Sequence, residues 1–207
     1  VEAGEVVYGI NTGFGKLAQT IIPPERLAEL QRNLVLSHSV GTGVPLPDGV
    51  VRLVLATKAV SLARGHSGVR PEIVDALLAL FNAGLLPRIP SKGSVGASGD
   101  LAPLAHVALA LIGEGECRVS GELVETGTAL KAANLDGLVL EAKEGLALLN
   151  GTHLMAATGA LCCADAARLI ECAIIGTAMS VDACRGSHGP FDARIHSVRK
   201  QPGQIEV

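Results

Sequence analysis

The segment from Gly93 to His106 holds a run of small residues that could build a reactive group from the backbone itself. Gly96, Ala97, Ser98 and Gly99 let the chain bend tightly. The amide nitrogen of Gly99 is not shielded by a Cβ, and if it is pressed against the Ala97 carbonyl carbon, a five-membered ring can close across Ser98. Loss of water, including the Ser98 hydroxyl, would leave an exocyclic methylene conjugated to the ring. That product is a strong electrophile, which side chains do not supply because they are nucleophiles, acids and bases.

The same loop also fits two ordinary interpretations. A Gly-rich stretch ending in Ser98-Gly99-Asp100 before a helix can bind an anion or simply cap the helix, and Asp100 is placed to cap a helix that starts near Leu101. A Walker loop is excluded because no Gly-Lys-Ser/Thr follows, and a nucleophile elbow because the order is not Gly-x-Ser-x-Gly. Taken alone, the loop leaves both ordinary interpretations open.

Several segments together resemble the aromatic amino acid ammonia-lyases, in which an Ala-Ser-Gly triplet cyclises to methylidene-imidazolone (MIO). The similar segments follow one another along essentially the whole chain: Tyr8–Gly15, Asn33–Gly41, the loop with Ala97-Ser98-Gly99, Leu148–Thr152 and Phe191–His196. The resemblance implies that MIO forms from the chain itself and that no external cofactor or metal is needed.

This resemblance also implies roles for single residues. The electrophile made from Ala97, Ser98 and Gly99 would capture the substrate amine, and Tyr8 would remove the β-proton. A phenol titrates near 10, so nearby donors or positive charge would have to favour its ionised form. Without the resemblance, a single tyrosine is more often a half-buried core ring. Asn150 would line the site and hold the substrate carboxylate or the ring carbonyl, although the residue before Gly151 also fits an ordinary helix end.

Substrate choice is expected to depend on Ser37-His38. This pair is similar to the histidine-specific branch of the family, whereas phenylalanine-specific relatives look apolar there and tyrosine-specific ones carry histidine first. His38 can exchange a hydrogen bond with a substrate imidazole, and a buried partner of that kind discriminates strongly. The expected reaction is deamination of L-histidine to trans-urocanate and ammonia, the first step of histidine degradation. The alternatives are an MIO-dependent lyase or aminomutase for another aromatic amino acid, or an inactive helical fragment.

The elements that position these residues are mostly helices. Apolar periodicity and Pro/Gly boundaries predict helices from Pro23 to Gly41, over 48–64, over 71–84, over 101–112 and over 141–149, a hairpin over 116–126, a Pro- and Gly-rich loop over 85–100 and a long helix over 152–183. The expected fold is mainly α. A loop-rich MIO-bearing region (1–150) leads into the start of a long-helix bundle (151–207) of the fumarase/aspartase kind, with a small β-hairpin.

Composition bounds the remaining possibilities. Hydrophobic residues make up 48% and charged residues 18%, so the chain can fold, and a net charge of −3 suggests neither nucleic acid nor a membrane surface as partner. In the long apolar run, Asp165, Arg168 and Glu171 share one helix face, which argues against a membrane span. We expect this helix to be buried in a bundle or an oligomer. The resemblance implies a homotetramer whose subunits complete each other's sites.

Cysteine and histidine usage points to a reducing cytoplasm and to no metal site. Five cysteines are an odd number without metal spacing, and the adjacent Cys162 and Cys163 are expected to be small core residues. The histidines other than His38 show no ligand spacing either and are expected to be structural: His66, His106, His153, His188 and His196. The chain does not begin with Met and its end, 201–207, is expected to be a connector, which suggests part of a longer protein.

Overall fold

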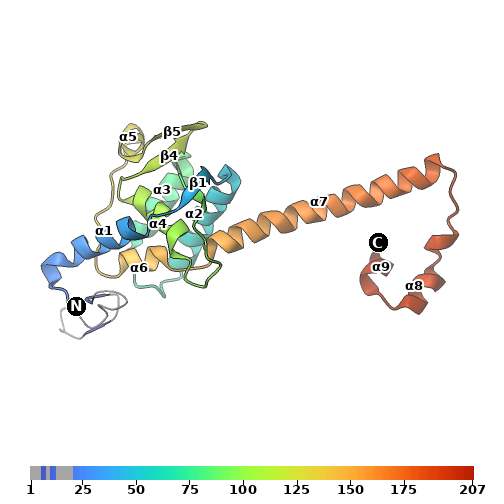
Figure 1. The fold of residues 1–207 in the computed structure, drawn as a ribbon, viewed down its shortest axis with the longest axis horizontal. Coiled ribbons are helices and arrows are strands. Elements are labelled where there is room, and N and C mark those ends of the chain that lie inside the picture. The colour runs from blue at the N-terminus through green and yellow to red at the C-terminus, as the bar shows by residue number, and fades with distance from the viewer. Residues whose placement is uncertain (1–5, 8–9, 13–20) are drawn as a thin grey trace. The chain divides into compact units, whose positions relative to one another are not determined.

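A computed structural model describes residues 6–7, 10–12 and 21–207 of the chain (Figure 1). It divides into two compact units, Val1–Thr158 and Gly159–Val207. Helix accounts for 59% and strand for 10%, so the predicted mainly helical class is confirmed. The predicted division after residue 150 stays a prediction, and Tyr8 lies outside the described residues.

Six α-helices and one 3-10 helix are described in the first unit. They are η2 (Pro24–Arg26), α1 (Leu27–His38), α2 (Asp48–Ala63), α3 (Pro71–Ala83), α4 (Leu101–Leu111), α5 (Thr126–Ala132) and α6 (Glu144–Leu149). The boundaries of α3 follow from its ends: Pro71 starts the helix, and Gly84 ends it in the left-handed region at φ 67°. The helix predicted from Pro23 starts later, because η2 precedes α1.

The strands form two small antiparallel sheets. In one, β1 (Thr42–Pro45) pairs with β3 (Pro90–Lys92). In the other, β4 (Glu116–Val119) lies between β2 (Leu86–Pro87) and β5 (Glu122–Glu125). The predicted hairpin is confirmed as β4–β5, and its turn residues Ser120 and Gly121 both have positive φ, as a tight two-residue hairpin turn requires. The predicted loop over 85–100 was wrong over 86–87 and 90–92, where short strands form.

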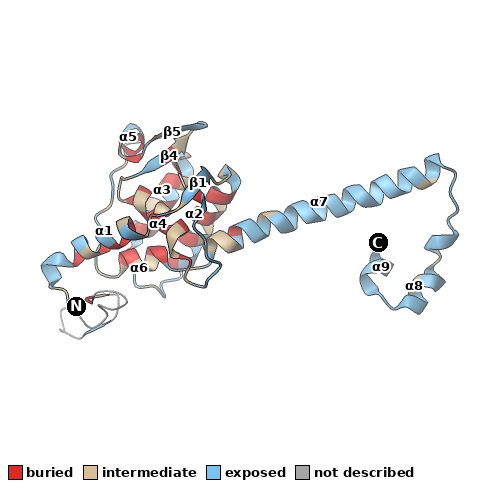
Figure 2. Cartoon of the chain, in the orientation of Figure 1, coloured by how far each residue is buried: buried red, intermediate tan, exposed pale blue. Residues whose placement is uncertain are grey.

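The core of the first unit is aliphatic and lies between its helices (Figure 2). Helices α2 and α3 pack together, and α4 packs against both α1 and α6. Leu55, Leu77, Leu104 and Leu148 are among the fully buried side chains. A buried Glu144 at the start of α6 receives both guanidinium arms of Arg70, at 2.8 Å each. This pair ties the start of α3 to α6.

The second unit begins within the long helix α7 (His153–Ala183) and continues with η3 (Gly189–Phe191), α8 (Ala193–Arg199) and α9 (Pro202–Glu206). The long helix was predicted. Within the end that was predicted to be a connector, Pro202–Glu206 form α9, with proline in the first turn. The connector role stays a prediction. No helix among residues 21–207 or the shorter described stretches is long and apolar enough to cross a membrane.

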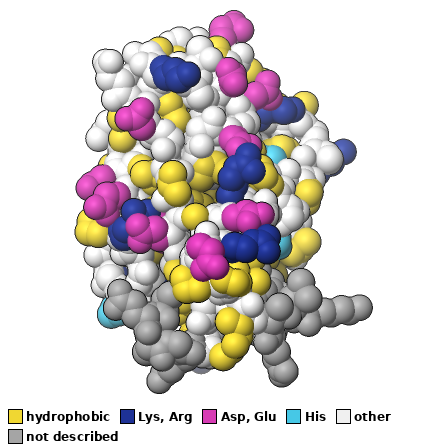
Figure 3. Space-filling view, turned by 90° about the vertical axis from the view of Figure 1, so that its left-hand side faces the viewer, with side chains coloured by type: hydrophobic (Ala, Val, Ile, Leu, Met, Phe, Trp, Pro, Cys, Tyr) yellow, Lys and Arg dark blue, Asp and Glu magenta, His cyan; other side chains and the backbone are white. Residues whose placement is uncertain are grey.

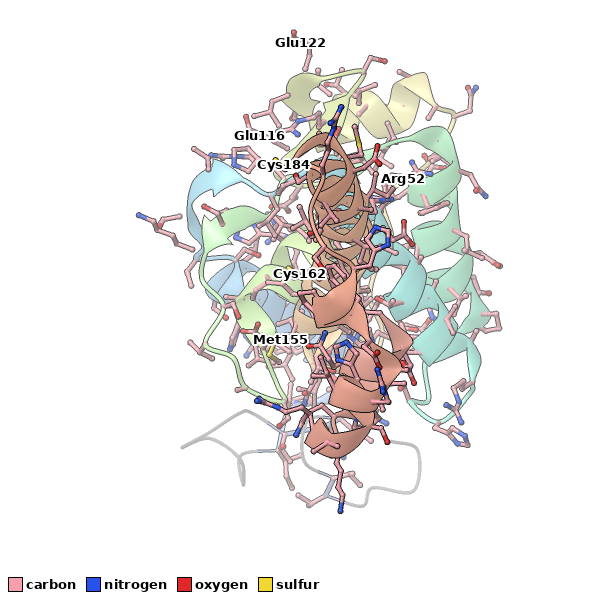
Figure 4. All side chains as sticks on the ribbon, turned by 90° about the vertical axis from the view of Figure 1, so that its right-hand side faces the viewer. Arg52, Glu116, Glu122, Met155, Cys162 and Cys184 are labelled. Atoms are coloured by element: carbon pink, nitrogen blue, oxygen red, sulfur yellow. The ribbon has the colours of Figure 1, made fainter. Side chains whose placement is uncertain are left out.

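Within this chain, α7 has one buried residue, Ala157. The expectation that Cys162 and Cys163 are core residues was wrong, because both side chains are exposed in this chain; Figure 4 labels Cys162. Burial of this helix in a bundle or an oligomer stays a prediction. Asp165 and Arg168 form an exposed ion pair at 3.0 Å, on one helix face as predicted.

Candidate active site

The loop 93–100 begins where β3 ends and leads directly into α4. Its base is held by the β1–β3 pairing, in which Thr42 faces Lys92. A Cβ on Gly93 would lie 3.2 Å from the Cα of Gly41, so the two backbones touch at this point. The stretch between α1 and β1 therefore lies against the start of the loop.

Asp100 closes the loop on itself. Its side chain is buried, with 1% exposed, and it accepts hydrogen bonds from the Ser94 hydroxyl at 2.5 Å and the Val95 amide at 3.0 Å. The expected capping of α4 by this side chain was wrong, because both carboxylate oxygens bond to the loop and no capping bond forms. The closure leaves Ala97 and Ser98 exposed at the tip.

Asn150 lies directly against the end of the predicted ring-forming triplet. A Cβ on Gly99 would meet the Asn150 Oδ1 at 2.9 Å, so this position admits a glycine and no larger residue without a shift. Asn150 follows the last residue of α6, and its amide donates to the Leu146 carbonyl at 3.0 Å. The Asp100 amide donates to the Gly151 carbonyl at 3.4 Å. The structure thus brings Asn150 and the loop together, as the resemblance implied.

Ser37 and His38 lie at the last turn of α1 and both bond to the Leu34 carbonyl. The Ser37 hydroxyl donates at 3.0 Å, and His38 Nδ1 lies 2.8 Å away. A carbonyl can only accept, so Nδ1 must carry the proton, and in the neutral ring Nε2 is left as an acceptor. No hydrogen bond joins either side chain to the loop 93–100 within the described structure.

The segment after His38 is linked to the helix that follows the loop. The Gly41 amide donates to His106 Nε2 of α4 at 3.2 Å. Burial lowers the pKa of His106, and the charge of Arg88 lowers it further, which keeps the ring neutral and able to accept. This bond and the β1–β3 pairing both connect the Ser37-His38 end of α1 to the loop region.

Tyr8 lies outside the described residues, so its role as base stays a prediction. The adjoining residues are described in part: the Asn11 side chain accepts a hydrogen bond from the Val7 amide at 2.8 Å. Thr12 forms an isolated antiparallel bridge with Ile21.

Sequence analysis missed Lys58, which lies behind Asn150. This lysine is 1% exposed in α2, and its Nζ donates to the Ala147 carbonyl at 2.7 Å and to the Asn150 carbonyl at 2.9 Å. Burial lowers its pKa to about 8. The sequence did contain a sign that Lys58 is buried. It continues, at helical spacing, the apolar stripe that runs from Val51, Val54 and Leu55 to Leu62.

His153, at the start of α7, lies near the same lysine. Burial, and then the charge of Lys58, lower the pKa of His153 to about 4, so the ring is neutral. Its Nδ1 is buried and has no hydrogen-bond partner in the described structure. Among the described residues, no group of three or more His, Cys, Asp and Glu side chains is arranged to hold a metal ion.

On the face drawn in Figure 3, acidic and basic side chains are interspersed. Such a face lacks the single-sign patch that binds a polyanion.

A family model for "Aromatic amino acid lyase" matches residues 1–207. The chain belongs to the aromatic amino acid lyase family. A histidine ammonia-lyase of Paracidovorax citrulli (strain AAC00-1) is 64% identical over 203 residues, which are 98% of this chain and 40% of that relative. The chain therefore spans about 40% of the length of the curated relatives it matches.

Solved structures of aromatic amino acid lyases and their relatives have the same fold. Histidine ammonia-lyase from Trypanosoma cruzi superposes with a TM-score of 0.91 at 41% identity, covering 99% of this chain and 40% of that one. Phenylalanine aminomutase from Pantoea agglomerans gives 0.89 at 35% identity, covering 99% and 39%.

The residues of this chain fit the group on which the aromatic amino acid lyase family depends, MIO. The triplet Ala97-Ser98-Gly99 is present at the tip of a closed loop, and a Cβ at the third position would lie 2.9 Å from the Asn150 Oδ1, so that the side chain of Asn150 would have to shift. An unhindered glycine nitrogen at that position is the chemical requirement for ring closure.

Proposed function

We propose that the protein carrying this chain deaminates L-histidine to trans-urocanate and ammonia, using MIO formed from Ala97, Ser98 and Gly99. The observation that carries the proposal is the closed loop with Gly99 set against Asn150. The preference for histidine is supported by Ser37-His38 and by the name of the relative that is 64% identical.

Formation of the group requires a bond between the Gly99 nitrogen and the Ala97 carbonyl carbon. One water is lost as the ring closes, and the Ser98 hydroxyl leaves in a second. The chain's contribution is to hold the loop bent: Asp100 fastens Ser94 and Val95 to the far side of the triplet. A bond that holds the ends in place reduces the entropy cost of closing the ring.

The finished group supplies an electrophile for the substrate amine, which the side chains of the protein lack. Tyr8 takes the β-proton of the substrate, the electrons of that C–H bond form the double bond, and the amine departs as ammonia. Asn150 holds the substrate carboxylate or the ring carbonyl through its amide. His38 Nε2 accepts a hydrogen bond from the substrate imidazole N–H, since its own Nδ1 proton is used by Leu34.

The proposal extends to the assembly. Further site residues come from outside residues 1–207, and the protein works as a homotetramer in the cytoplasm, where its unpaired cysteines stay reduced.

Intact mass and product analysis of the full natural-length protein test the proposal. We expect a mass lower by two waters, localised to the peptide with residues 97–99, and absorbance of urocanate when histidine is added. Ser98→Ala should keep the full mass and lose activity. An unmodified wild-type serine together with full ammonia release would overturn the proposal.

A substrate panel separates the two kinds of MIO enzyme that the similar structures include. Histidine, phenylalanine and tyrosine are offered, and products are followed as α,β-unsaturated acid or as β-amino acid. A β-amino acid product would favour an aminomutase, the activity named for the Pantoea agglomerans structure. Exchange of His38 for Leu should reduce kcat/KM for histidine more than for phenylalanine.

A further inference from the structure

Lys58 is a buried cation that donates its hydrogen bonds to backbone carbonyls. It lies in the middle of α2 with 1% of its surface exposed. Among the described residues no carboxylate pairs with it; its ammonium donates to the carbonyls of Ala147 and Asn150. A lysine is rarely buried without a counter-charge, because removing an ammonium from water is costly. The reason for its burial should therefore lie in the carbonyl groups that its ammonium binds.

Both carbonyls belong to the end of α6. The last carbonyls of a helix have no partner within the helix and carry partial negative charge, so a cation there stabilises them. Lys58 fastens two of them at once, at 2.7 and 2.9 Å. One of the two belongs to Asn150, and its peptide is thereby held in place from the side of α2.

The other side of the same segment faces the loop. The Asn150 Oδ1 lies 2.9 Å from where a Cβ of Gly99 would be, and the Gly151 carbonyl accepts from the Asp100 amide. The short stretch Asn150-Gly151 is therefore clamped between a buried ammonium and the end of the ring-forming triplet. A shift of its backbone would carry the carboxamide away from Gly99.

We propose that Lys58 is a positioning residue that acts through Asn150: by binding the Asn150 carbonyl it sets the place of the carboxamide beside residues 97–99. This inference rests on the proposed function for its kinetic consequence. Its structural consequence, the immobilisation of Asn150 and Gly151, holds whatever the substrate is. A misplacement of about 1 Å can cost roughly 100-fold in rate.

A double-mutant cycle on the full natural-length protein tests the kinetic part. Lys58→Met removes the donors while keeping length and burial, and Asn150→Ala removes the carboxamide. We expect each single variant to lose kcat, the lysine variant by roughly 100-fold, and the double variant to be no slower than Asn150→Ala alone. Non-additivity marks a residue that acts through its neighbour. Losses that multiply would overturn the proposal.

Leu55→Ala supplies the matched control. Leu55 is buried in the same helix, so its truncation to alanine destabilises the protein. Its side chain makes no hydrogen bond to the end of α6. Its loss should multiply with that of Asn150→Ala. If Lys58→Met does not fold, Lys58→Gln, which keeps an amide donor, replaces it and should show a smaller but still non-additive loss.

Hydrogen exchange separates this proposal from the proposed function. In Lys58→Met the amides of Asn150 and Gly151 should exchange faster than in wild type, while in Leu55→Ala they should change only as much as the rest of the core. This readout needs no substrate. If histidine is not a substrate, the proposed function fails. The double-mutant cycle is then measured with the aromatic amino acid that the enzyme does use. Unchanged exchange at 150–151 overturns the positioning role even if histidine is deaminated.

Discussion

Both units of the chain are rich in apolar residues, but these side chains are buried in the first unit and exposed in the second. Residues up to Ala157 contain all of the buried apolar side chains that the structure describes. From Gly159 onward the chain is still rich in apolar residues, yet Leu169, Ile170, Ile174 and Met179 are exposed. The difference shows that apolar periodicity predicts a helix without telling whether the same chain supplies what covers it.

The same contrast holds for ion pairs. Glu144 is buried against Arg70, with two guanidinium bonds of 2.8 Å and a backbone bond from Glu141. Asp165 and Arg168 form a pair of the same chemical kind with 69% and 75% of the side chains exposed. Environment rather than pairing therefore decides how much each contributes to stability.

The largest expected effect comes from separating the two units. A fragment of residues 1–158 keeps its core and should unfold in one cooperative, sigmoidal transition. A peptide of residues 159–207 has no core of its own and should lose its circular dichroism signal gradually on heating. The two melts are followed at 222 nm at low concentration. A cooperative melt of monomeric 159–207 would contradict the comparison.

Removing the buried carboxylate should be the next largest effect. Glu144→Ala leaves the Arg70 guanidinium with only the Glu141 carboxylate and the Val139 carbonyl, and it also removes the acceptor of the Arg70 and Glu141 amides. It should lower the free energy of unfolding by about 3 kcal/mol. Glu144→Gln keeps the shape and should lose less. Chemical denaturation of the 207-residue chain measures both. Equal stability of wild type and Glu144→Ala would show that the pair contributes nothing.

A pH titration tests His153, a half-buried histidine of the first unit. His153 has a pKa of about 4 in the folded chain, because burial and the charge of Lys58 disfavour its protonated form, against an ordinary value near 6.5. Between these values the unfolded chain binds more protons, so stability should fall as the pH drops from about 6.5 to about 4. In His153→Asn this fall should be shallower, while both proteins should have similar pH dependence above pH 8. Parallel curves across the acid range would contradict the assignment.

Most elements of the fold could be predicted from residues close together in sequence. The predictions failed where contacts between residues far apart in sequence decide the structure. The ends of α3, the β4–β5 turn and the long helix follow from residues next to one another, whereas the place of Asn150 beside the loop was implied by the family resemblance. Helix α5 was missed because its first residues, Thr126-Gly127-Thr128, are poor helix formers, and packing overrides their propensity. Strands β2 and β3, of two and three residues, carry too little periodicity to be found.

The role of Lys58 could not be predicted for a different reason. Its partner carbonyls lie 89 and 92 residues away along the chain, and backbone carbonyls leave no mark in a sequence. Asp100 is a related case: its position before α4 correctly predicts a helix start, but the Ser94 hydroxyl and Val95 amide take up its carboxylate. The sequence pointed to Asp100 but not to Lys58, and in both cases the fold decided what the side chain bonds to.

The smallest expected effect is on the exposed pair of α7. Arg168→Ala removes an ion pair that water screens, and both side chains are free to move, so helix stability should change by no more than about 0.5 kcal/mol. Helix content of the 207-residue chain and its salt dependence are compared with wild type. Arg70→Ala in the first unit serves as the positive control in the same assay. A loss at Arg168 as large as that at Arg70 would mean that this face of α7 is covered in solution, and the contrast between the two units would then belong to the isolated chain alone.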